Sequence, residues 1–203
     1  MAVVVPALTA TPASFWMLSQ LERMREAYRQ LDRLAATDSL TGCLNRRAFR
    51  EIATTAGRTT GALLIADADR FKSINDRFGH DVGDEALRAI AAAVRASVRD
   101  ADIVGRIGGE EFGILLPDAD LEMALNIAGR IRRAVRELAF SAEGQHWPLS
   151  ISIGGACHTA NTSFTDLFRA ADQRLYAVKR SGRDGVDIAA TPEEEAAETS
   201  AAA

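Results

Sequence analysis

The stretch Asp102–Leu116 reads DIVGRIGGEEFGILL, and it decides the fold of this chain of 203 residues. Two apolar segments flank Gly108 and Gly109, and this pattern predicts two antiparallel strands joined by a tight hairpin whose glycines take a positive φ. Glu110 and Glu111 lie at the tip of this hairpin. Adjacent carboxylates repel each other, which costs stability unless a cation or a base offsets their charge. The pair is therefore either a solvated turn or part of a cation-binding site.

Helical and strand patterns alternate on both sides of the hairpin. Apolar residues spaced three and four apart predict helices, and short apolar runs between turn residues predict strands. The predicted helices are Arg46–Thr54 with Asn45 as its N-cap, Gly83–Val98, Asp120–Leu138 and Thr165–Arg180. The predicted strands are Ala62–Ala66, Asp102–Ile107, Glu111–Leu116, Leu149–Ala156 and a short last one, Gly185–Ile188. One hairpin combined with crossover helices predicts an α/β sheet layered with helices.

Composition and charge exclude several classes of protein. The net charge of -4 comes from the end of the chain, because residues 189–203 hold four glutamates and no base. The rest is close to neutral, and no basic block indicates a nucleic-acid polymer as partner. The two cysteines, Cys43 and Cys157, are too few for a disulfide framework, which favours reduced thiols and a cytoplasmic location. No apolar run is long enough to span a membrane.

The sequence predicts four parts along the chain. Residues 1–14 contain prolines and small residues and are expected to form a loose leader. Residues 15–37 form a helix, residues 38–188 the folded domain, and residues 189–203 a disordered acidic tail. The helix has apolar residues at alternating spacings of four and three, as in a heptad seam. These residues are Met17, Leu21, Met24, Tyr28, Leu31 and Ala35. The seam is either the contact of a homodimer or the side of a helix on the domain's own surface.

A second acidic group follows the predicted strand Ala62–Ala66, in the form Asp67-Ala68-Asp69. Acids at the end of a strand lie where open α/β sheets bind ligands, and hard divalent ions prefer such oxygen ligands. Alone, this motif fits a turn or a helix cap equally well. Together with Glu110 and Glu111, at the end of another strand, it indicates a shared metal site of the kind used in phosphoryl transfer.

The segment Phe71–Asp84 is dense in polar residues and glycine. Lys72 closely follows the acidic group and can meet a triphosphate. Asp84 can accept from both the ring N–H and the amino group of guanine, a donor pair that adenine lacks. Asn75 and Asp84 have a plainer alternative in turn and capping chemistry, because Asp84 stands where it can cap the following helix.

These motifs together resemble the GGDEF family closely. The signature stands as Gly108–Phe112 in the GGEEF form, and the resemblance runs from about Asp38 to Ile188. The other matching motifs are Asp38–Arg47, Asp67–Lys72, Asn75-Asp76, Gly79-His80, Gly83-Asp84, Ser150–Gly154, Leu175–Lys179 and Gly182-Arg183.

The resemblance implies a diguanylate cyclase, which condenses two GTP molecules into cyclic di-GMP and two pyrophosphates. It implies a palm-like fold similar to adenylyl cyclase catalytic domains, of the α/β or α+β class, with a central, mostly antiparallel sheet flanked by helices. Each subunit of a homodimer would hold one GTP with two Mg²⁺ or Mn²⁺ ions. The heptad seam of residues 15–37 is a sensible device for such a dimer.

The resemblance also assigns roles to individual residues. Asp67, Glu110 and the backbone carbonyl of Ala68 would bind the metals, with Glu111 assisting near them. Glu110 is also the candidate for helping to deprotonate the attacking 3′-hydroxyl.

Substrate binding is implied in the same way, with guanine held by Asn75 and Asp84. The groups implied for the phosphates are Lys72, Lys179, Arg183 and the backbone amides around Arg70 and Phe71. Arg183 stands four residues after Lys179, so one helical face presents both if the helix continues past Gly182. Otherwise the pair is a solvated helix end.

Arg99 and Asp102 resemble the family's RxxD inhibitory site, at which the product binds and restrains the enzyme. Arg99 would stack on guanine and pair with phosphate, while Asp102 accepts from guanine. Arg130 is a weaker candidate for a partner arginine from a second surface. An arginine and an aspartate this close are also common at any junction between a helix and a strand.

Three other functions stay open at this stage. The domain can be a sensor that binds cyclic di-GMP with little synthesis, although a sensor has no need of the intact acidic set. It can be a cyclase with relaxed base choice, although Asp84 favours guanine. It can also be a protein-interaction scaffold that uses the helix at residues 15–37.

Overall fold

The computed structural model describes residues 14–24, 36–56, 59–159 and 162–189. The chain divides into two compact units, Met1–Ala36 and Thr37–Ala203. None of the helices within the described ranges has the length and apolar character needed to cross a membrane.

In the first unit, residues 14–24 are helical, as the sequence predicts. Three side chains of the predicted seam fall in this helix, and Met17, Leu21 and Met24 are all exposed. The remaining seam positions lie outside the described residues, as do residues 1–13 of the predicted leader. The dimer seam therefore stays a prediction.

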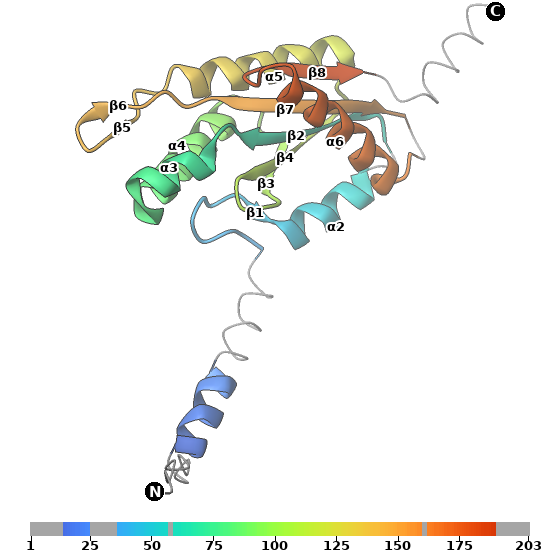
Figure 1. The fold of residues 1–203 in the computed structure, drawn as a ribbon. Helices are drawn as coiled ribbons and strands as arrows, with labels where there is room; N and C mark the ends of the chain where they lie inside the picture. The colour runs from blue at the N-terminus through green and yellow to red at the C-terminus, as the bar shows by residue number, and fades with distance from the viewer. Residues whose placement is uncertain (1–13, 25–35, 57–58, 160–161, 190–203) are drawn as a thin grey trace, which may run out of the picture. The chain divides into compact units, whose positions relative to one another are not determined.

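The second unit is built on a six-stranded sheet of order β1-β3-β4-β2-β7-β8 (Figure 1). The central pairs β3–β4, β4–β2 and β2–β7 are antiparallel, and the outer pairs β1–β3 and β7–β8 are parallel. Its strands are β1 (Leu44–Asn45), β2 (Gly61–Ala68), β3 (Ile103–Arg106), β4 (Glu111–Pro117), β7 (Ile151–His158) and β8 (Val186–Ala189). A separate ribbon pairs β5 (Ser141–Ala142) with β6 (Gln145–His146). The predicted mixed fold with a mostly antiparallel central sheet is confirmed.

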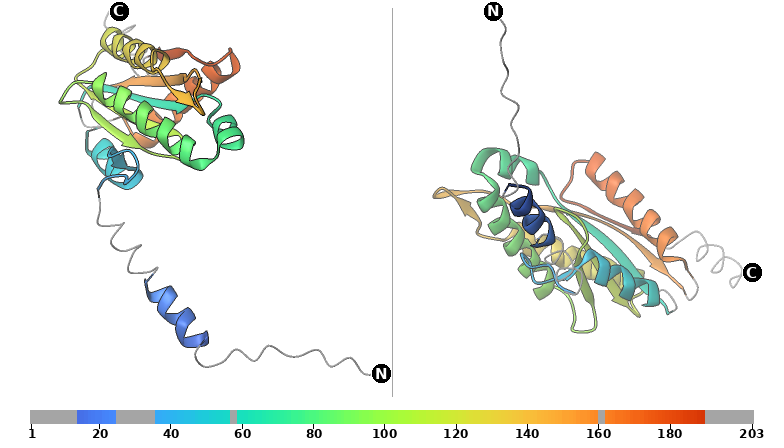
Figure 2. Two further views of the ribbon diagram at one scale, coloured as in Figure 1. Left: turned by 90° about the vertical axis from the view of Figure 1, so that its left-hand side faces the viewer. Right: turned by 90° about the horizontal axis from the view of Figure 1, so that it is seen from below.

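Helices cover both faces of the sheet, as the two views of Figure 2 show. The helices are α2 (Arg46–Ala56), α3 (Phe71–Phe78), α4 (His80–Ala96), α5 (Leu121–Arg136) and α6 (Phe164–Arg180). Ala62 and Leu64 of β2 pack in the cluster under α4 and α5, whereas Leu63 and Ile65 pack in the cluster under α2 and α6. Because alternate residues of a strand point to opposite faces, Asp67 lies on the face that α2 and α6 cover.

The segment between β2 and α4 is more helical than the sequence predicts. Phe71 and Ile74 are the buried residues of α3. The sequence did not predict this helix, because most of its other residues are polar. Gly79, at φ 86°, separates α3 from α4, which begins at His80 rather than at Gly83. Asp84 consequently lies within α4, so the expectation that it can cap this helix is wrong. The other predicted cap is confirmed, because Asn45 Oδ1 accepts the Ala48 N–H at 2.9 Å.

The predicted hairpin between β3 and β4 is present, with Gly105 opposite Gly113. The expected positive φ is not, because neither Gly108 nor Gly109 has one. Space, rather than backbone conformation, is limited at position 108. A Cβ there would collide with the side chain of Glu111, which folds back against the turn. The backbone N–H groups of Ile107 and Gly108 both donate to the Glu111 carbonyl and close the turn.

The last strand, β8, ends at Ala189, which is the first residue that the sequence assigned to the tail. Ala189 pairs with Ala156 of β7. The rest of the predicted tail lies outside the described residues.

Candidate active site

Asp67 and Glu111 are direct partners across the antiparallel strands β2 and β4. Like charges placed directly opposite each other in a sheet destabilise it. A Cβ on Gly113 would meet Phe49 of α2. Because residues two apart in a strand share a face, Glu111 also lies on the face that α2 covers, as Asp67 does. The sheet therefore concentrates negative charge at the end of β2, under α2 and α6.

Lys179 of α6 supplies the positive charge at this point. Its Nζ lies 2.8 Å from Asp67 Oδ2, and Asp67 is buried. Burial raises the pKa of the Asp67 carboxyl, while the hydrogen bond and the charge of Lys179 oppose that rise. The lysine ammonium thus acts as counter-ion for an acid that would otherwise be poorly solvated.

Glu110 joins the same group from the turn before β4. Its backbone carbonyl accepts the Ala68 N–H at 3.1 Å, which fixes the turn to the end of β2. Burial raises the pKa of Glu110, the charge of Asp67 raises it further, the charge of Lys179 opposes this, and the charge of Glu111 adds to it. The charges of Asp67 and Glu111 therefore act on Glu110. These three carboxylates together are called the acidic edge.

The geometry can be compared with the requirements of a metal site. Among the described residues, no three His, Cys, Asp or Glu side chains are close enough together to hold a metal ion by themselves. The set implied for the metals includes the Ala68 carbonyl, and phosphate oxygens of a nucleotide can complete it. Burial and the charges of Asp67 and Glu111 raise the pKa of Glu110, and a bound divalent cation would offset the repulsion among these carboxylates. The residues present therefore fit a cation that arrives together with a nucleotide.

Asp69 has a separate role that the sequence did not reveal. Its carboxylate accepts from Ser150 Oγ at 2.8 Å, from Ser152 Oγ at 2.6 Å and from the Asp184 backbone N–H at 3.0 Å. It thereby ties the end of β2 to β7 and to the loop after α6. The Ser-x-Ser spacing was a possible signal, because residues two apart in a strand lie on one face.

The residues implied for phosphate binding flank this edge from two elements. Arg70 precedes α3 in a left-handed conformation, with φ 54° and ψ 27°. Its carbonyl accepts the Ser73 N–H at 2.8 Å, so the first turn of α3 begins at the end of the sheet. Phe71 is buried at the start of this helix, and Lys72 is exposed beside it.

Lys179 and Arg183 do not share a helical face, contrary to one expectation. Helix α6 ends at Arg180, and Gly182, at φ 125°, turns the chain away. The Arg183 N–H then donates to the Val178 carbonyl at 3.1 Å. Arg183 nevertheless stays within electrostatic range of Asp67, because its charge opposes the rise that burial causes in the pKa of Asp67.

Asn75 lies where α3 packs against Gly83 of α4, and Asp84 is the next residue of α4. A Cβ on Gly83 would collide with the side-chain oxygen of Asn75 and approach the ring of Phe71, so glycine allows the two helices to pack this closely. The Asn75 Oδ1 atom is buried without a hydrogen-bond partner. Asp84, next to Gly83, is half-buried. An unsatisfied buried acceptor is suited to a ligand that carries N–H donors.

Arg99 and Asp102 form a tight pair elsewhere, after α4. The Arg99 Nη2 lies 2.6 Å from Asp102 Oδ1 and 3.1 Å from the Pro117 carbonyl oxygen. The Asp102 side chain is fully covered, so its carboxylate is not open to a guanine while this pair is closed. Arg130 donates from Nε to the Ser97 carbonyl at 2.8 Å, and it lines a cavity of about 370 Å³ together with Arg99. The structure thus brings the two predicted arginines to one cavity.

A further link, absent from the sequence-based expectations, joins the start of the domain to the signature turn. Arg106 Nη2 donates to the Gly109 carbonyl at 2.7 Å, and its Nη1 lies 3.2 Å from Asp38 Oδ1. Asp38 Oδ1 also accepts from the Thr41 N–H and hydroxyl at 2.9 and 2.6 Å. An arginine at the end of a short strand, just before the turn, was the only signal of this link in the sequence.

At one end of a mostly antiparallel sheet, acids from two neighbouring strands lie near a lysine and an arginine. This arrangement defines an α+β domain suited to nucleoside phosphates. The chain belongs to the GGDEF family, because the family model described as diguanylate cyclase, GGDEF domain, matches residues 35–185.

Several characterised proteins are similar to this chain. It is 40% identical over 176 residues to diguanylate cyclase DgcM of Escherichia coli K12, covering 83% of this chain and 41% of that protein. It is 43% identical over 163 residues to the response regulator PleD of Caulobacter vibrioides NA1000, covering 75% and 36%. The chain thus spans about two fifths of the length of these curated relatives.

The fold is similar to that of solved GGDEF structures. The coiled coil and GGDEF domain of DgcB from Caulobacter crescentus, in complex with c-di-GMP, gives a TM-score of 0.73 at 29% identity, covering 89% of this chain and all of that one. The active GGEEF domain of a diguanylate cyclase from Vibrio cholerae gives 0.64 at 34% identity, covering 73% and 96%.

Proposed function

We propose that this chain is a diguanylate cyclase, which condenses two GTP molecules into cyclic di-GMP and two pyrophosphates. The observation that carries the proposal is the convergence of Asp67, Glu110 and Glu111 at one end of the sheet, with Lys179 and Arg183 beside them. Family membership and the relatives named diguanylate cyclases support the same reaction.

Cyclases of this family are generally metal-dependent. We infer that two Mg²⁺ or Mn²⁺ ions per half-site are held by Asp67, the Ala68 carbonyl and Glu110, with Glu111 close to them. When bound, the ions neutralise the triphosphate and orient its α-phosphate.

Glu110 is the residue best suited to move the proton. A general base must lie within reach of the proton that it accepts, and the hydrogen bond from the Ala68 N–H to the Glu110 carbonyl keeps this residue at the end of β2, beside Asp67. The 3′-hydroxyl of one GTP gives its proton to Glu110, and its oxygen forms a bond to the α-phosphorus of the other GTP. The bond to pyrophosphate breaks in line. The same exchange in the opposite direction closes the ring.

The basic residues position the triphosphate for this step. Lys179 exchanges Asp67 for the β- and γ-phosphates, and Arg183 and Lys72 approach them from the neighbouring turns. The backbone amides around Arg70 and Phe71, at the start of α3, contribute donors to the same phosphates. Positioning and charge neutralisation of this kind supply most of the catalysis in phosphoryl transfer.

Guanine is selected at the junction of α3 and α4. Leaving the buried Asn75 Oδ1 without a donor costs about 1–3 kcal/mol, and a guanine N–H would remove that cost. Asp84 accepts from the ring N–H and the amino group together. Adenine cannot satisfy both residues, which favours GTP over ATP.

A homodimer is required because each subunit binds one nucleotide and the two must face each other. The exposed apolar side chains of residues 14–24, among them Met17, Leu21 and Met24, support a dimer through this helix. Cys43 and Cys157 are buried and are not joined in a disulfide, which supports a cytoplasmic location.

The decisive experiment incubates the full chain with GTP and Mg²⁺ and separates the nucleotide products by chromatography. We expect cyclic di-GMP and pyrophosphate from the parent chain, and a loss of at least about a hundredfold for Glu110→Gln. Glu137→Gln is the matched control, because Glu137 is exposed at the end of α5, and it should retain full turnover. Unchanged turnover in Glu110→Gln would remove this residue from the mechanism.

A second candidate function is a cyclic di-GMP sensor with little synthesis. The cavity lined by Arg99 and Arg130 supports product binding, in either a sensor or a cyclase with feedback inhibition. A chain that makes no product from GTP, yet binds cyclic di-GMP through these arginines, would favour the sensor.

A further inference from the structure

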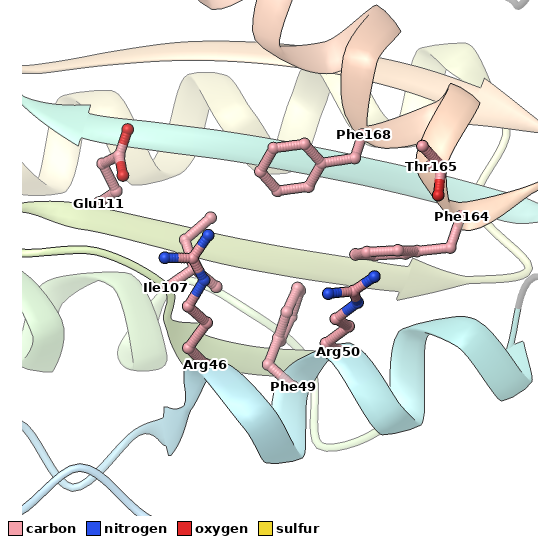
Figure 3. Close-up of a pocket in the computed structure, with 8 residues that line it drawn as sticks. All are labelled: Arg46, Phe49, Arg50, Ile107, Glu111, Phe164, Thr165 and Phe168. Atoms are coloured by element: carbon pink, nitrogen blue, oxygen red, sulfur yellow. The ribbon is translucent and has the colours of Figure 1, made fainter.

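A cavity of about 210 Å³ opens between α2 and α6, on the same face of the sheet as Asp67 (Figure 3). Its inner wall is aromatic and apolar. Phe49 and Ile107 are buried beneath it, and the rings of Phe164 and Phe168 lie beside it with centroids 5.8 Å apart and planes tilted by 49°. Of the residues that line this cavity, only Glu111 has a part in the proposed cyclase reaction.

Two arginines stand at the rim of the cavity. Arg46 and Arg50 are one turn apart on α2, exposed, and neither side chain has an ion pair or hydrogen bond with any described residue. Their neighbour Arg47, by contrast, pairs with Glu51 at 3.0 Å. Like charges at this spacing repel by a few tenths of a kcal/mol, roughly, unless an anion lies between them. The rim therefore carries two guanidinium groups that lack acidic partners.

Glu111 lies at one end of the cavity, away from Phe164 and Thr165, as Figure 3 shows. It also lines a neighbouring cavity that contains Lys179. Positive charge therefore lies over α2 and negative charge toward the catalytic residues. A ligand that fits this distribution has an anionic group at one end and hydrogen-bond donors at the other.

We propose that this cavity is a second binding site for a free purine nucleotide, separate from the guanine site at Asn75 and Asp84. Bases stack on aromatic side chains, guanidinium groups pair with phosphate in a bidentate manner, and a carboxylate accepts from the donors on a base edge. Phe164 and Phe168 supply the first of these contacts, the arginines the second and Glu111 the third.

The size of the cavity selects a mononucleotide. Sites for larger ligands measure about 300–1,000 Å³, so this cavity takes a single base and leaves its phosphate at the open rim. A nucleotide held here engages Glu111 and withdraws its carboxylate from the acidic edge. The site therefore couples the concentration of purine mononucleotides to the activity of the neighbouring catalytic residues.

Binding of GMP, measured by calorimetry without metal ions, tests the site. Introducing Asn75→Ala and Asp84→Ala into the full chain removes the guanine contacts of the proposed catalytic site. We expect this chain to retain one saturable GMP site. Adding Arg46→Gln and Arg50→Gln should weaken that site at least tenfold, as removal of two charge-assisted contacts to phosphate predicts.

Arg47→Gln, added to the same chain, is the matched control and should leave the affinity for GMP unchanged. Circular dichroism checks that each variant is folded. Absence of GMP binding in the chain with Asn75→Ala and Asp84→Ala, or equal weakening by Arg47→Gln, overturns the proposal. The measurement needs no turnover, so it remains decisive even if the chain makes no cyclic di-GMP.

Discussion

Lys179 Nζ lies 2.8 Å from Asp67 Oδ2, so a lysine ammonium neutralises the buried carboxylate at the end of β2. Asp67 also faces Glu111 across the sheet, which makes this position unfavourable for a third negative charge and favourable for any cation. In the proposed cycle the lysine would move to the triphosphate, and Asp67 would then hold a metal ion. In the free protein, Lys179 thus occupies the position beside Asp67 that a metal ion would take.

This exchange predicts a link between Lys179 and metal binding. Lys179→Met should lower the free energy of unfolding by about 1–2 kcal/mol at neutral pH, less than for a fully buried pair because the lysine side chain is 32% exposed. Mg²⁺ should then stabilise the variant more than the parent, because Asp67 no longer has a competing partner. Urea denaturation with and without Mg²⁺ measures both effects.

Lys72→Met is the control for that experiment, because Lys72 is exposed on α3 and has no ion pair with a described residue. It should unfold like the parent at every Mg²⁺ concentration. An equal response of both variants to Mg²⁺ would mean that Lys179 and the metal do not share a position.

The link between Asp38 and Arg106 predicts a pH-dependent contribution to stability. Burial tends to raise the pKa of Asp38, but hydrogen bonds from Thr41 and the hydrogen bond and charge of Arg106 outweigh it, holding the pKa below its ordinary value of 3.8. A carboxyl whose pKa is lowered by folding stabilises the protein above its unfolded pKa and loses this effect as the pH falls through the folded value. Asp38→Asn should therefore lower the free energy of unfolding by about 1 kcal/mol at neutral pH.

The difference between Asp38→Asn and the parent should shrink as the pH falls below 3.8. Denaturation curves at a series of pH values test this. Asp166→Asn is the control, because Asp166 and Arg169 form an exposed pair, and such pairs contribute little. A deficit in Asp38→Asn that persisted in acid would show that the charge is not what matters.

Much of this molecule follows from the sequence, and what does not has physical causes. The hairpin, the main strands and the cap at Asn45 follow from local patterns, because hydrophobic alternation and turn residues act over short distances. Helix α3 was missed because only Phe71 and Ile74 are buried in a polar segment, and its packing depends on Gly83 of α4. The Asp69 bonds to Ser150 and Asp184 were also missed.

The site shows the same limit. Asp67 and Glu111 were predicted to share a site because each stands at a strand end, and they do lie opposite each other. The turn that keeps Arg183 near Asp67 was not predictable, since the spacing suggested a helical face. Long-range contacts depend on how elements pack, and spacing within one element carries no information about that packing.

Arg99 should govern inhibition by the product if the cavity beside it binds cyclic di-GMP. Arg99→Ala should weaken inhibition at least tenfold, because a charge-assisted contact to phosphate is lost. It should also lower the free energy of unfolding by about 1–2 kcal/mol, since Arg99 donates to Asp102 and to the Pro117 carbonyl. Cyclase assays with added cyclic di-GMP measure the first effect and urea denaturation the second.

Variants of two other arginines distinguish an effect on product binding from an effect on the stability of the fold. Arg130→Ala should also weaken inhibition, because Arg130 lines the same cavity. Arg133→Ala, exposed on the same helix, should leave inhibition unchanged. Undiminished inhibition in both Arg99→Ala and Arg130→Ala would place the product elsewhere.

The two glycines of the signature turn should differ in what they tolerate. A Cβ on Gly108 would collide with the Glu111 side chain, whereas a Cβ on Gly109 meets no heavy atom within 4 Å. Neither glycine has a positive φ, so alanine strains the backbone at neither position. Gly109→Ala should keep the free energy of unfolding within about 0.5 kcal/mol of the parent, whereas Gly108→Ala must displace the Glu111 carboxylate.

We therefore expect Gly108→Ala to reduce cyclic di-GMP synthesis at least tenfold while the protein stays folded, and Gly109→Ala to reduce it much less. Chromatography of the products and urea denaturation of each variant separate the two effects. If Gly109→Ala is folded and equally inactive, the space beside Gly109 belongs to the nucleotide rather than to the protein. If both variants turn over like the parent, the turn does not hold the carboxylate of Glu111 in place. The position of Glu111 at the start of β4 is then sufficient for activity.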